Sequence, residues 1–342
     1  MGTGVEGVYF SPYPANHDHM GNLTVAAIAP PDVLRELGKK GTSSDITFYN
    51  LKRNLDTVTL VEPSRYPERL SSLYFSVSMA KAAILVIDEI TPQLGECILM
   101  LDSAGVSEGY IILRNYLGRD QVEPLLAGTL LERYLFCEPN WIELKEMLLK
   151  RAARVKSDEP PEGSMPHGTM AIDHHFNVKG IGTVVLGGVV DGCLRKHDPL
   201  KALPGEKGAQ LRSIQKHDDD SGYAIKDDRV GLALKNIEAD DLDRGFVLTT
   251  DPAVLVTDEI HADAQLVKYW PSPIHEGMVL YSGHWMQFIS GKVTDVRDAG
   301  DFRHPSLTIS LDKPLVYLPG DIVVLHYLEG GKLRIVGTLK MN

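Results

Sequence analysis

The stretch IDHHFNVKGIGTVVLGGVVDG, from Ile172 to Gly192, is the most informative part of this chain for its fold. β-Branched residues alternate in it with glycines, and it ends in Asp191-Gly192, a dipeptide typical of tight turns between antiparallel strands. The segment Lys179–Gly182 gives the backbone freedom to turn, and Thr183–Leu186 is typical of a strand. On these grounds alone the stretch predicts a β-hairpin or the corner of a barrel.

The sequence around this stretch divides into three parts. The first part alternates apolar strand-like runs, such as Ala82–Asp88, with amphipathic helix-like runs, such as Trp141–Leu149, which predicts a doubly wound parallel sheet. A charged, proline-containing linker follows at 156–164, and from there the apolar period is two up to the C-terminus. We therefore predict an α/β plus all-β chain, with an α/β domain over 1–156 and two antiparallel β-barrels over 165–260 and 261–342.

Composition excludes several classes of protein. The 342 residues carry a formal net charge of -11, which argues against a protein that coats nucleic acid but permits recognition of one end of an RNA. The sequence has no apolar run of about 18 residues, and its N-terminus lacks the basic start and apolar core of a signal peptide. The three cysteines are far apart and lack C-x-x-C spacing, so the sequence indicates neither a zinc site nor a disulfide framework. We expect a cytoplasmic protein without a DNA or membrane partner.

Two later segments follow the opening stretch in order. Arg229–Ile237 reads RVGLALKNI, and Asp240–Leu248 reads DDLDRGFVL. Together with Ile172–Gly192, these segments resemble the second domain of the SelB/EF-Tu-like translational GTPases, which carry aminoacyl-tRNA, and the pattern is most similar to archaeal SelB-like elongation factors. The resemblance implies an EF-Tu-like architecture, in which a P-loop-GTPase-like doubly wound sheet precedes two β-barrels.

The resemblance also implies a site for the 3′ end of aminoacyl-tRNA on the second domain. It assigns six residues to that site: Asp173, His174, Phe176, Gly182, Thr183 and Arg229. Arginine and histidine can hydrogen-bond an ester carbonyl, aspartate can bind an α-ammonium group, phenylalanine can pack on the terminal adenine, and glycine leaves room for a close backbone approach. A plainer interpretation of the residue types remains open, in which Asp173 and His174 cap a strand and Arg229 forms a surface ion pair.

The phosphate loop of a GTPase, G-x-x-x-x-G-K-[ST], has a poor match in this chain. The best register is Asn16–Leu23, which retains Gly21 but has Asn22 in place of the lysine and Leu23 in place of the hydroxyl. A shifted register reaches Thr24 without supplying a lysine. We interpret Gly21, Asn22 and Thr24 as parts of a vestigial nucleotide site.

The other nucleotide signatures of the family are altered as well. Glu62–Arg65 stands where the family has D-x-x-G, Asn115–Gly118 where it has N-K-x-D, and Phe136–Glu138 at the last base-contacting loop. Gly41–Thr47 resembles a switch segment, with Thr47 or Thr42 as the candidate hydroxyl. We add Thr47 and Asn115 to the vestigial site and expect that GTP binding and hydrolysis are lost, that no catalytic residue or cofactor is present, and that GTP with Mg²⁺ binds only if an atypical site works.

Histidines next to aspartates suggest metal ligands at two places, His17–His19 and Asp173–His175. Adjacent residues on a strand point to opposite faces, and a catalytic metal needs a third ligand and an open position. We therefore expect no metal site.

Three functional hypotheses follow from the sequence. The first is a SelB/EF-Tu-like elongation factor paralogue that binds an aminoacyl-tRNA 3′ end on its second domain without timing by GTP hydrolysis. The second is a non-catalytic scaffold that binds the ribosome or a protein. The third is a GTP-binding elongation factor with an atypical phosphate site.

Overall fold

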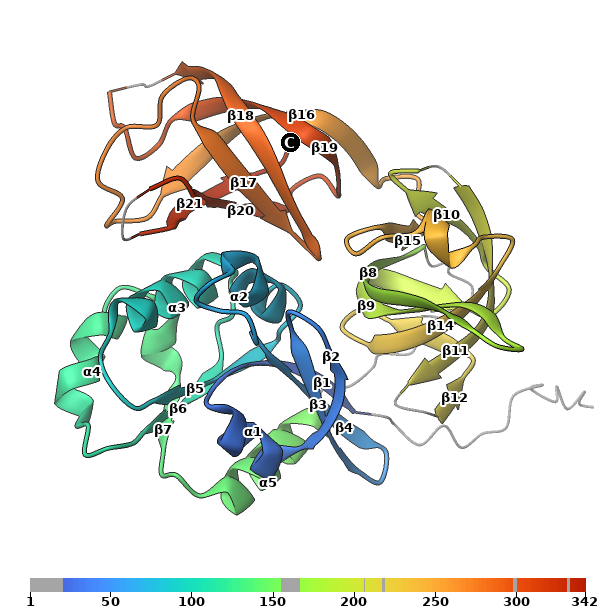
Figure 1. Ribbon diagram of the computed structural model, residues 1–342, viewed down its shortest axis with the longest axis horizontal. Helices are drawn as coiled ribbons and strands as arrows, with labels where there is room; N and C mark the ends of the chain where they lie inside the picture. Colours follow the sequence, from blue (N-terminus) through green and yellow to red (C-terminus); the bar gives the residue numbers. More distant parts are fainter. Residues whose placement is uncertain (1–20, 155–166, 206, 217–218, 298–299, 331–332) are drawn as a thin grey trace, which may run out of the picture.

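The structure, a computed structural model, describes residues 21–154, 167–205, 207–216, 219–297, 300–330 and 333–342 (Figure 1). The predicted linker at 156–164 lies outside these residues, as does the segment 16–20 with its two histidines. Within the described residues, no helix combines the length and the apolar character needed to cross a membrane.

The first domain is a seven-stranded mixed sheet with helices on both faces. Its elements are β1 (Asn22–Ile28), α1 (Pro31–Leu37), β2 (Lys39–Ser43), β3 (Thr47–Arg53), β4 (Asp56–Glu62), α2 (Leu70–Val77), β5 (Ala82–Ile87), α3 (Pro92–Ser103), β6 (Gly109–Leu113), α4 (Arg119–Leu126), the 3₁₀-helix η1 (Leu130–Arg133), β7 (Leu135–Cys137) and α5 (Trp141–Ala152). The strand order is β2-β3-β4-β1-β5-β6-β7, and β4, β1, β5, β6 and β7 are mutually parallel. All six residues of β5 are buried because α1 and α5 cover one face of the sheet while α2, α3 and α4 cover the other. The predicted doubly wound sheet is confirmed, but it is not wholly parallel, because β2 and β3 add an antiparallel edge.

The second domain is a closed antiparallel barrel. Its elements are β8 (Gly168–Val178), β9 (Gly182–Arg195), β10 (Pro199–Leu203), β11 (Lys207–Lys216), β12 (Asp219–Ser221), β13 (Tyr223–Ile225), β14 (Arg229–Lys235), the 3₁₀-helix η2 (Ala239–Asp241) and β15 (Val247–Thr249). The sheet order β10-β15-β8-β9-β14-β11 closes because β10 also pairs with β11. The hairpin of β8 and β9 is the stretch with which the sequence analysis began, and its turn contains Gly180 with φ +83°.

The predicted turn at Asp191-Gly192 is wrong. Both residues lie inside β9, where Gly192 has φ +67° and the pairing with β8 shifts by one residue between Thr169 and Met170. A Cβ on Gly192 would lie 1.8 Å from the carbonyl oxygen of His167. Val190, directly before the dipeptide, is the extra residue of a β-bulge, and Gly192 beside it has the left-handed conformation that a turn would also use.

The third domain is a six-stranded antiparallel barrel in the order β16-β19-β18-β17-β20-β21. Its strands are β16 (Leu255–Leu266), β17 (Val279–His284), β18 (Gln287–Arg297), β19 (Ser306–Tyr317), β20 (Ile322–His326) and β21 (Ile335–Lys340). The first strand begins at Leu255, upstream of the predicted start of this domain at residue 261. The short turn between β17 and β18 is directed toward the place where the three domains meet (Figure 1).

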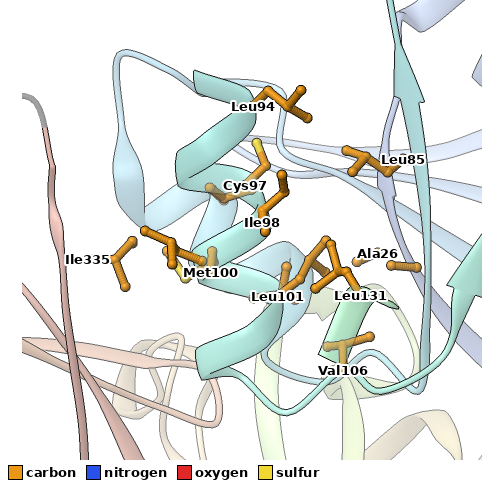
Figure 2. Close-up of a cluster of buried hydrophobic side chains, with 14 of the residues drawn as sticks. Ala26, Leu85, Leu94, Cys97, Ile98, Met100, Leu101, Val106, Leu131 and Ile335 are labelled. Carbon is orange, nitrogen blue, oxygen red and sulfur yellow. The ribbon is translucent and has the colours of Figure 1, made fainter. Parts of the chain in front are cut away.

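The third domain packs on helices α2 and α3 of the first. Ile335 belongs to the same apolar cluster as Met100 of α3, and Figure 2 shows the two side chains facing one another. Beside this cluster, Arg334 pairs with Glu96 of α3, with Nε and Nη2 at 2.9 and 2.5 Å from the carboxylate oxygens. Apolar burial and a buried ion pair therefore fix the third domain against the first.

Candidate functional site

Three of the six residues assigned to the aminoacyl site form one buried cluster. Arg229, at the start of β14, places Nη2 3.0 and 2.9 Å from the two carboxylate oxygens of Asp173 on β8. His174 Nδ1 lies 2.8 Å from Asp173 Oδ1. Burial opposes ionisation of Asp173, but Arg229 and His174 outweigh it and hold the pKa of that carboxyl below its usual value. The ion pair of the plainer interpretation exists, but it is buried rather than on the surface.

A segment of the first domain covers this cluster. The ring of Phe48 on β3 lies 4.0 Å from the Arg229 guanidinium carbon and meets the His174 ring edge-on at 5.6 Å. Ser44 Oγ lies 3.2 Å from His174 Nε2. The covering residues belong to or adjoin the predicted switch segment, Gly41–Thr47, so in this structure that segment contacts the second domain.

The cluster borders a cleft of about 730 Å³ between the domains. Its lining includes Asp173, His174, His175, Arg244, Phe288 and Lys313. Arg244 anchors one side, because its Nε donates to the Asp173 carbonyl at 3.1 Å and its Nη1 lies 2.7 Å from Asp45 Oδ1. Four of these lining residues are basic types, which gives this acidic chain a local surface suited to an anionic or hydrogen-bond-accepting ligand.

The other three assigned residues lie toward the tip of the β8–β9 hairpin. Phe176 is 39% exposed, so its ring is available to a ligand. Gly182 has φ +97° with open space where a Cβ would stand. Thr183 is buried, and its hydroxyl donates to the Ile237 carbonyl at 2.7 Å. Thr183 therefore holds the hairpin against the barrel through a hydrogen bond that leaves its hydroxyl occupied.

The predicted register of the phosphate loop is wrong. Asn22 and Thr24 lie in β1, and the carbonyl of Gly21 accepts hydrogen bonds from Thr57 at the start of β4. These residues are at the amino ends of the parallel strands, whereas open α/β sheets bind ligands at the carboxyl ends. The register failed because a single matching glycine is a weak signal beside the apolar run of β1.

The loop that occupies the phosphate-loop position follows β1 and is very short. Only Ala29 and Pro30 separate β1 from α1, which begins at Pro31. Phosphate is held at such a place by backbone N–H groups and a lysine, and proline has no N–H. Neither a glycine nor a lysine stands in this two-residue loop, in contrast to a phosphate loop of the form G-x-x-x-x-G-K-[ST].

Thr47 and Asn115 do lie at the carboxyl edge of the sheet. The Thr47 hydroxyl is 2.6 Å from Ser64 Oγ, and Asn115 follows β6 with φ +53°. On the same edge, Arg114 places Nε 2.9 Å from Asp88 and Nη1 3.6 Å from Asp32. A phosphate placed there would meet two carboxylates that already hold the nearby cation.

Sequence reasoning missed three residues that build the centre of the molecule. Arg244 and Asp45 form a largely buried ion pair between the first two domains, and Trp285 reaches this region from the turn between β17 and β18. Arg244 stands in the D-x-x-R-G motif of the sequence, so the sequence could have identified this residue. It could not have identified the contact of Arg244 with Asp45. Neither Asp45 nor Trp285 has a signal in the sequence that distinguishes it from a surface residue.

Comparisons with known proteins agree with this architecture. Residues 182–249 match the family Elongation factor Tu domain 2. Over 94% of its length the chain is 35% identical to the whole of an uncharacterized protein, MJ0325, from Methanocaldococcus jannaschii. It is 27% identical to the selenocysteine-specific elongation factor of the same organism, over 61% of this chain and 48% of that factor.

Among solved structures, translation elongation factor SelB from Methanococcus maripaludis in complex with the GTP analogue GPPNHP matches 95% of this chain and 80% of its own, with a TM-score of 0.76 and 20% identity. The fold is therefore that of an EF-Tu-like factor of three domains. The chain belongs to the SelB/EF-Tu-like translational GTPase family. The similarity to MJ0325 extends over nearly the full length of both proteins. The selenocysteine-specific elongation factor is about twice as long as the region that aligns with this chain. Homology to these factors supports a translation elongation factor-like role.

Proposed function

We propose that this chain is an elongation factor paralogue that binds the aminoacylated 3′ end of a tRNA in the cleft beside Asp173, without the use of GTP. The observation that carries the proposal is the meeting of Asp173, His174 and Arg229, beside a cleft that also exposes Arg244 to a ligand. The cleft volume of about 730 Å³ lies within the ~300–1,000 Å³ range of small-molecule sites. An elongation role of this kind places the protein in the cytoplasm.

The chemistry of the cleft suits an aminoacyl ester. His174 and Arg244 supply hydrogen-bond donors for a carbonyl or a phosphate, and the carboxylate of Asp173 can attract an α-ammonium group. Phe176, on the same strand, offers an exposed ring on which an adenine can stack. Because Phe48 and Ser44 cover Arg229 and His174, a 3′ end reaches the cluster from the side of the cleft or after displacement of the covering segment.

A titration of the full chain with charged and deacylated tRNA tests the proposal, each with and without GTP and Mg²⁺. We expect saturable binding of charged tRNA, weaker binding of deacylated tRNA, and no effect of GTP. The Phe176→Ala variant should weaken binding by about tenfold, since base stacking on an aromatic ring contributes roughly 1–3 kcal/mol. Leu255→Ala, which removes another exposed apolar side chain from the third domain, serves as the matched control.

Arg229→Ala and Arg229→Lys extend the test to the buried cluster, with circular dichroism used to confirm that each variant is folded. Both substitutions should reduce the affinity for charged tRNA. The proposal is wrong if the wild-type chain does not bind charged tRNA, or if Phe176→Ala and Arg229→Lys both bind it as the wild type does.

The loss of GTP binding is the second part of the proposal and has its own experiment. It is supported by Pro30 and Pro31 at the phosphate-loop position and by the ion pairs of Arg114 at the same edge. We expect no heat of binding in a calorimetric titration with up to about 1 mM GTP and Mg²⁺. Micromolar binding would contradict it and would favour an elongation factor with an atypical phosphate site.

A scaffold is the alternative function that a specific observation favours. The side chains of Ile90, Tyr116 and Ile142 are exposed in segments that follow β5, β6 and β7, at the carboxyl edge where the family binds its nucleotide. Exposed apolar side chains at a shared edge can bind a protein or the ribosome. Co-sedimentation with ribosomes that is lost in Tyr116→Ala but retained in Phe176→Ala would support the scaffold over aminoacyl-tRNA binding.

A further inference from the structure

Three exposed apolar side chains share the carboxyl edge of the sheet in the first domain. Ile90 follows β5, Tyr116 follows β6, and Ile142 lies in the first turn of α5 after β7. These three strands are adjacent and parallel (Figure 1). Because neighbouring strands lie about 4.8 Å apart, the segments that follow them begin side by side. We call the surface that the three side chains form the carboxyl-edge surface.

Contacts between these segments connect them to one another. Asn115 Nδ2 donates to the Asp88 carbonyl at 3.4 Å, and Arg114 Nε lies 2.9 Å from Asp88 Oδ1, so the segments after β5 and β6 are held together. At the start of α4, the guanidinium carbon of Arg119 lies 4.9 Å from the ring centroid of Phe136 on β7. The carboxyl-edge surface is therefore one connected surface rather than three separate side chains.

The backbone of Tyr116 is strained, and its side chain is fully exposed. Asn115 and Tyr116 have φ +53° and +63°, and this left-handed conformation is rare for a bulky residue such as tyrosine. The relative exposure of Tyr116 is 108%, so its ring packs on no other part of the chain. Strained residues of this kind are concentrated at binding and active sites. We infer that Tyr116 serves a contact outside this chain.

The charge around these side chains is negative. The segments that follow β1, β5, β6 and β7, namely 29–32, 88–92, 114–121 and 138–143, contain six carboxylates and two arginines. Both arginines are engaged, because Arg114 pairs with Asp88 and Asp32 while Arg119 lies over the Phe136 ring. The exposed carboxylates include Glu89, Asp120, Glu138 and Glu143. A partner that is complementary to this surface therefore carries positive charge.

We propose that the carboxyl-edge surface binds a protein segment rich in lysine and arginine that also carries apolar or aromatic side chains. The apolar side chains of the segment pack on Tyr116 and its two exposed neighbours, and its cations face the surrounding carboxylates. The same negative charge repels the phosphates of RNA. The proposal gives the scaffold a partner of stated chemistry and does not depend on tRNA binding, since the cleft beside Asp173 is lined by other residues.

The test measures binding of three fluorescein-labelled peptides to the full chain by fluorescence anisotropy. The peptide KKLWKKLLKKLK is basic and amphipathic, EELWEELLEELE reverses its charges, and KKSSKKSSKKSK lacks its apolar side chains. We expect saturable binding of the first peptide and at least tenfold weaker binding of each of the other two. The affinity of the first peptide should fall as salt is raised, because exposed charges are screened.

Two variants locate the binding surface, each with a matched control. Tyr116→Ala should weaken binding of KKLWKKLLKKLK at least tenfold, since exposed tyrosines are frequent centres of protein interfaces. Leu255→Ala, at an exposed apolar residue of the third domain, should leave the affinity unchanged. Glu138→Lys should also weaken binding, while Asp258→Lys, which reverses an exposed charge in the third domain, should have little effect.

The proposal is overturned if the wild type does not bind KKLWKKLLKKLK, if the three peptides bind equally, or if Tyr116→Ala binds as Leu255→Ala does. A labelled single-stranded RNA of 12 nucleotides is titrated in parallel. RNA binding that is lost in Tyr116→Ala would assign the surface to nucleic acid and would also overturn the proposal. Tyr116→Ala should bind charged tRNA as the wild type does, so failure of this proposal and failure of the proposed function are distinguishable.

Discussion

Arg244 of the second domain holds Asp45 of the first, with Nη1 2.7 and 2.8 Å from the two carboxylate oxygens. The guanidinium also lies 5.0 Å from the ring centroid of Phe75 on α2. Burial opposes ionisation of Asp45, but the hydrogen bonds and charge of Arg244 outweigh it and hold the pKa of Asp45 below its usual value. The switch-like segment is thus joined to the second domain by a charged contact between two side chains.

Removal of this contact should loosen the first two domains. We expect Asp45→Ala to lower the free energy of unfolding by about 1–3 kcal/mol, because a largely buried charged hydrogen bond is lost. Urea unfolding measures the change, and a double-mutant cycle with Arg244→Ala isolates the pair. The matched control is Asp219→Ala, which breaks the exposed interdomain pair of Asp219 with Lys52 and should cost about 0–1 kcal/mol. Equal costs for the two pairs would contradict the prediction.

The buried pair of Asp173 and Arg229 gives a larger expected effect. Arg229→Ala leaves a carboxylate that is 4% exposed without its cation, and such truncations cost about 3–5 kcal/mol. The added substitution Asp173→Asn removes the unpaired charge, so the double variant should be more stable than Arg229→Ala alone. Thermal and urea unfolding of the three proteins test this order, and a double variant less stable than Arg229→Ala would be the opposite result.

The pair of Glu96 and Arg334 should control how firmly the third domain is held. Glu96 is 5% exposed and also accepts a hydrogen bond from Tyr66 Oη at 2.9 Å. Arg334→Ala should destabilise the chain by about 3–5 kcal/mol and increase its radius of gyration in small-angle X-ray scattering, because Glu96 loses its cation at the domain interface. Arg297→Ala, on an arginine whose side chain is 83% exposed in the third domain, should change neither quantity.

Stability should also depend on pH through His326. This residue is fully buried against Tyr74 and Phe288, and burial lowers its pKa from 6.5 to about 4. Between these values the unfolded chain binds more protons, so stability is present above pH 6.5 and is lost as the pH falls toward 4. The loss from pH 7 to pH 5 should be about 2 kcal/mol for this group.

The variant His326→Asn tests the assignment. Its amide can replace the donor that lies at Nδ1, 3.0 Å from the Tyr281 carbonyl, but it does not titrate. Urea unfolding at pH 7 and pH 5 should show a smaller pH dependence for the variant, even though its stability at pH 7 is lower. An unchanged difference between the two pH values would assign the effect to other groups.

The sequence predicted the architecture because its signals are local. The apolar run of β5 and the period-two pattern after residue 164 depend only on which residues stand near one another in the chain. The prediction from sequence failed where one local signal is compatible with two different local structures. Asp191-Gly192 fits a turn or a strand beside a bulge, since a left-handed glycine occurs in both, and one glycine could not locate the phosphate loop.

Part of the candidate site could also be predicted, because some of its residues lie in local sequence motifs. Asp173, His174 and Arg229 could be assigned from motifs, and the structure brings them together. The residues that cover and join this cluster, Phe48 and Asp45, come from another domain. Nothing in a single sequence records which surfaces of separate domains meet.

The sequence by itself determined the order of the three domains and the family to which the chain belongs, because hydrophobic period and motif spacing are encoded residue by residue. Only the tertiary structure decided that a switch-like segment covers Arg229, that Trp285 reaches the place where the three domains meet, and that β1 ends in a loop of two residues. These are contacts and boundaries set by packing, which depends on the shape and charge of surfaces far apart in the chain.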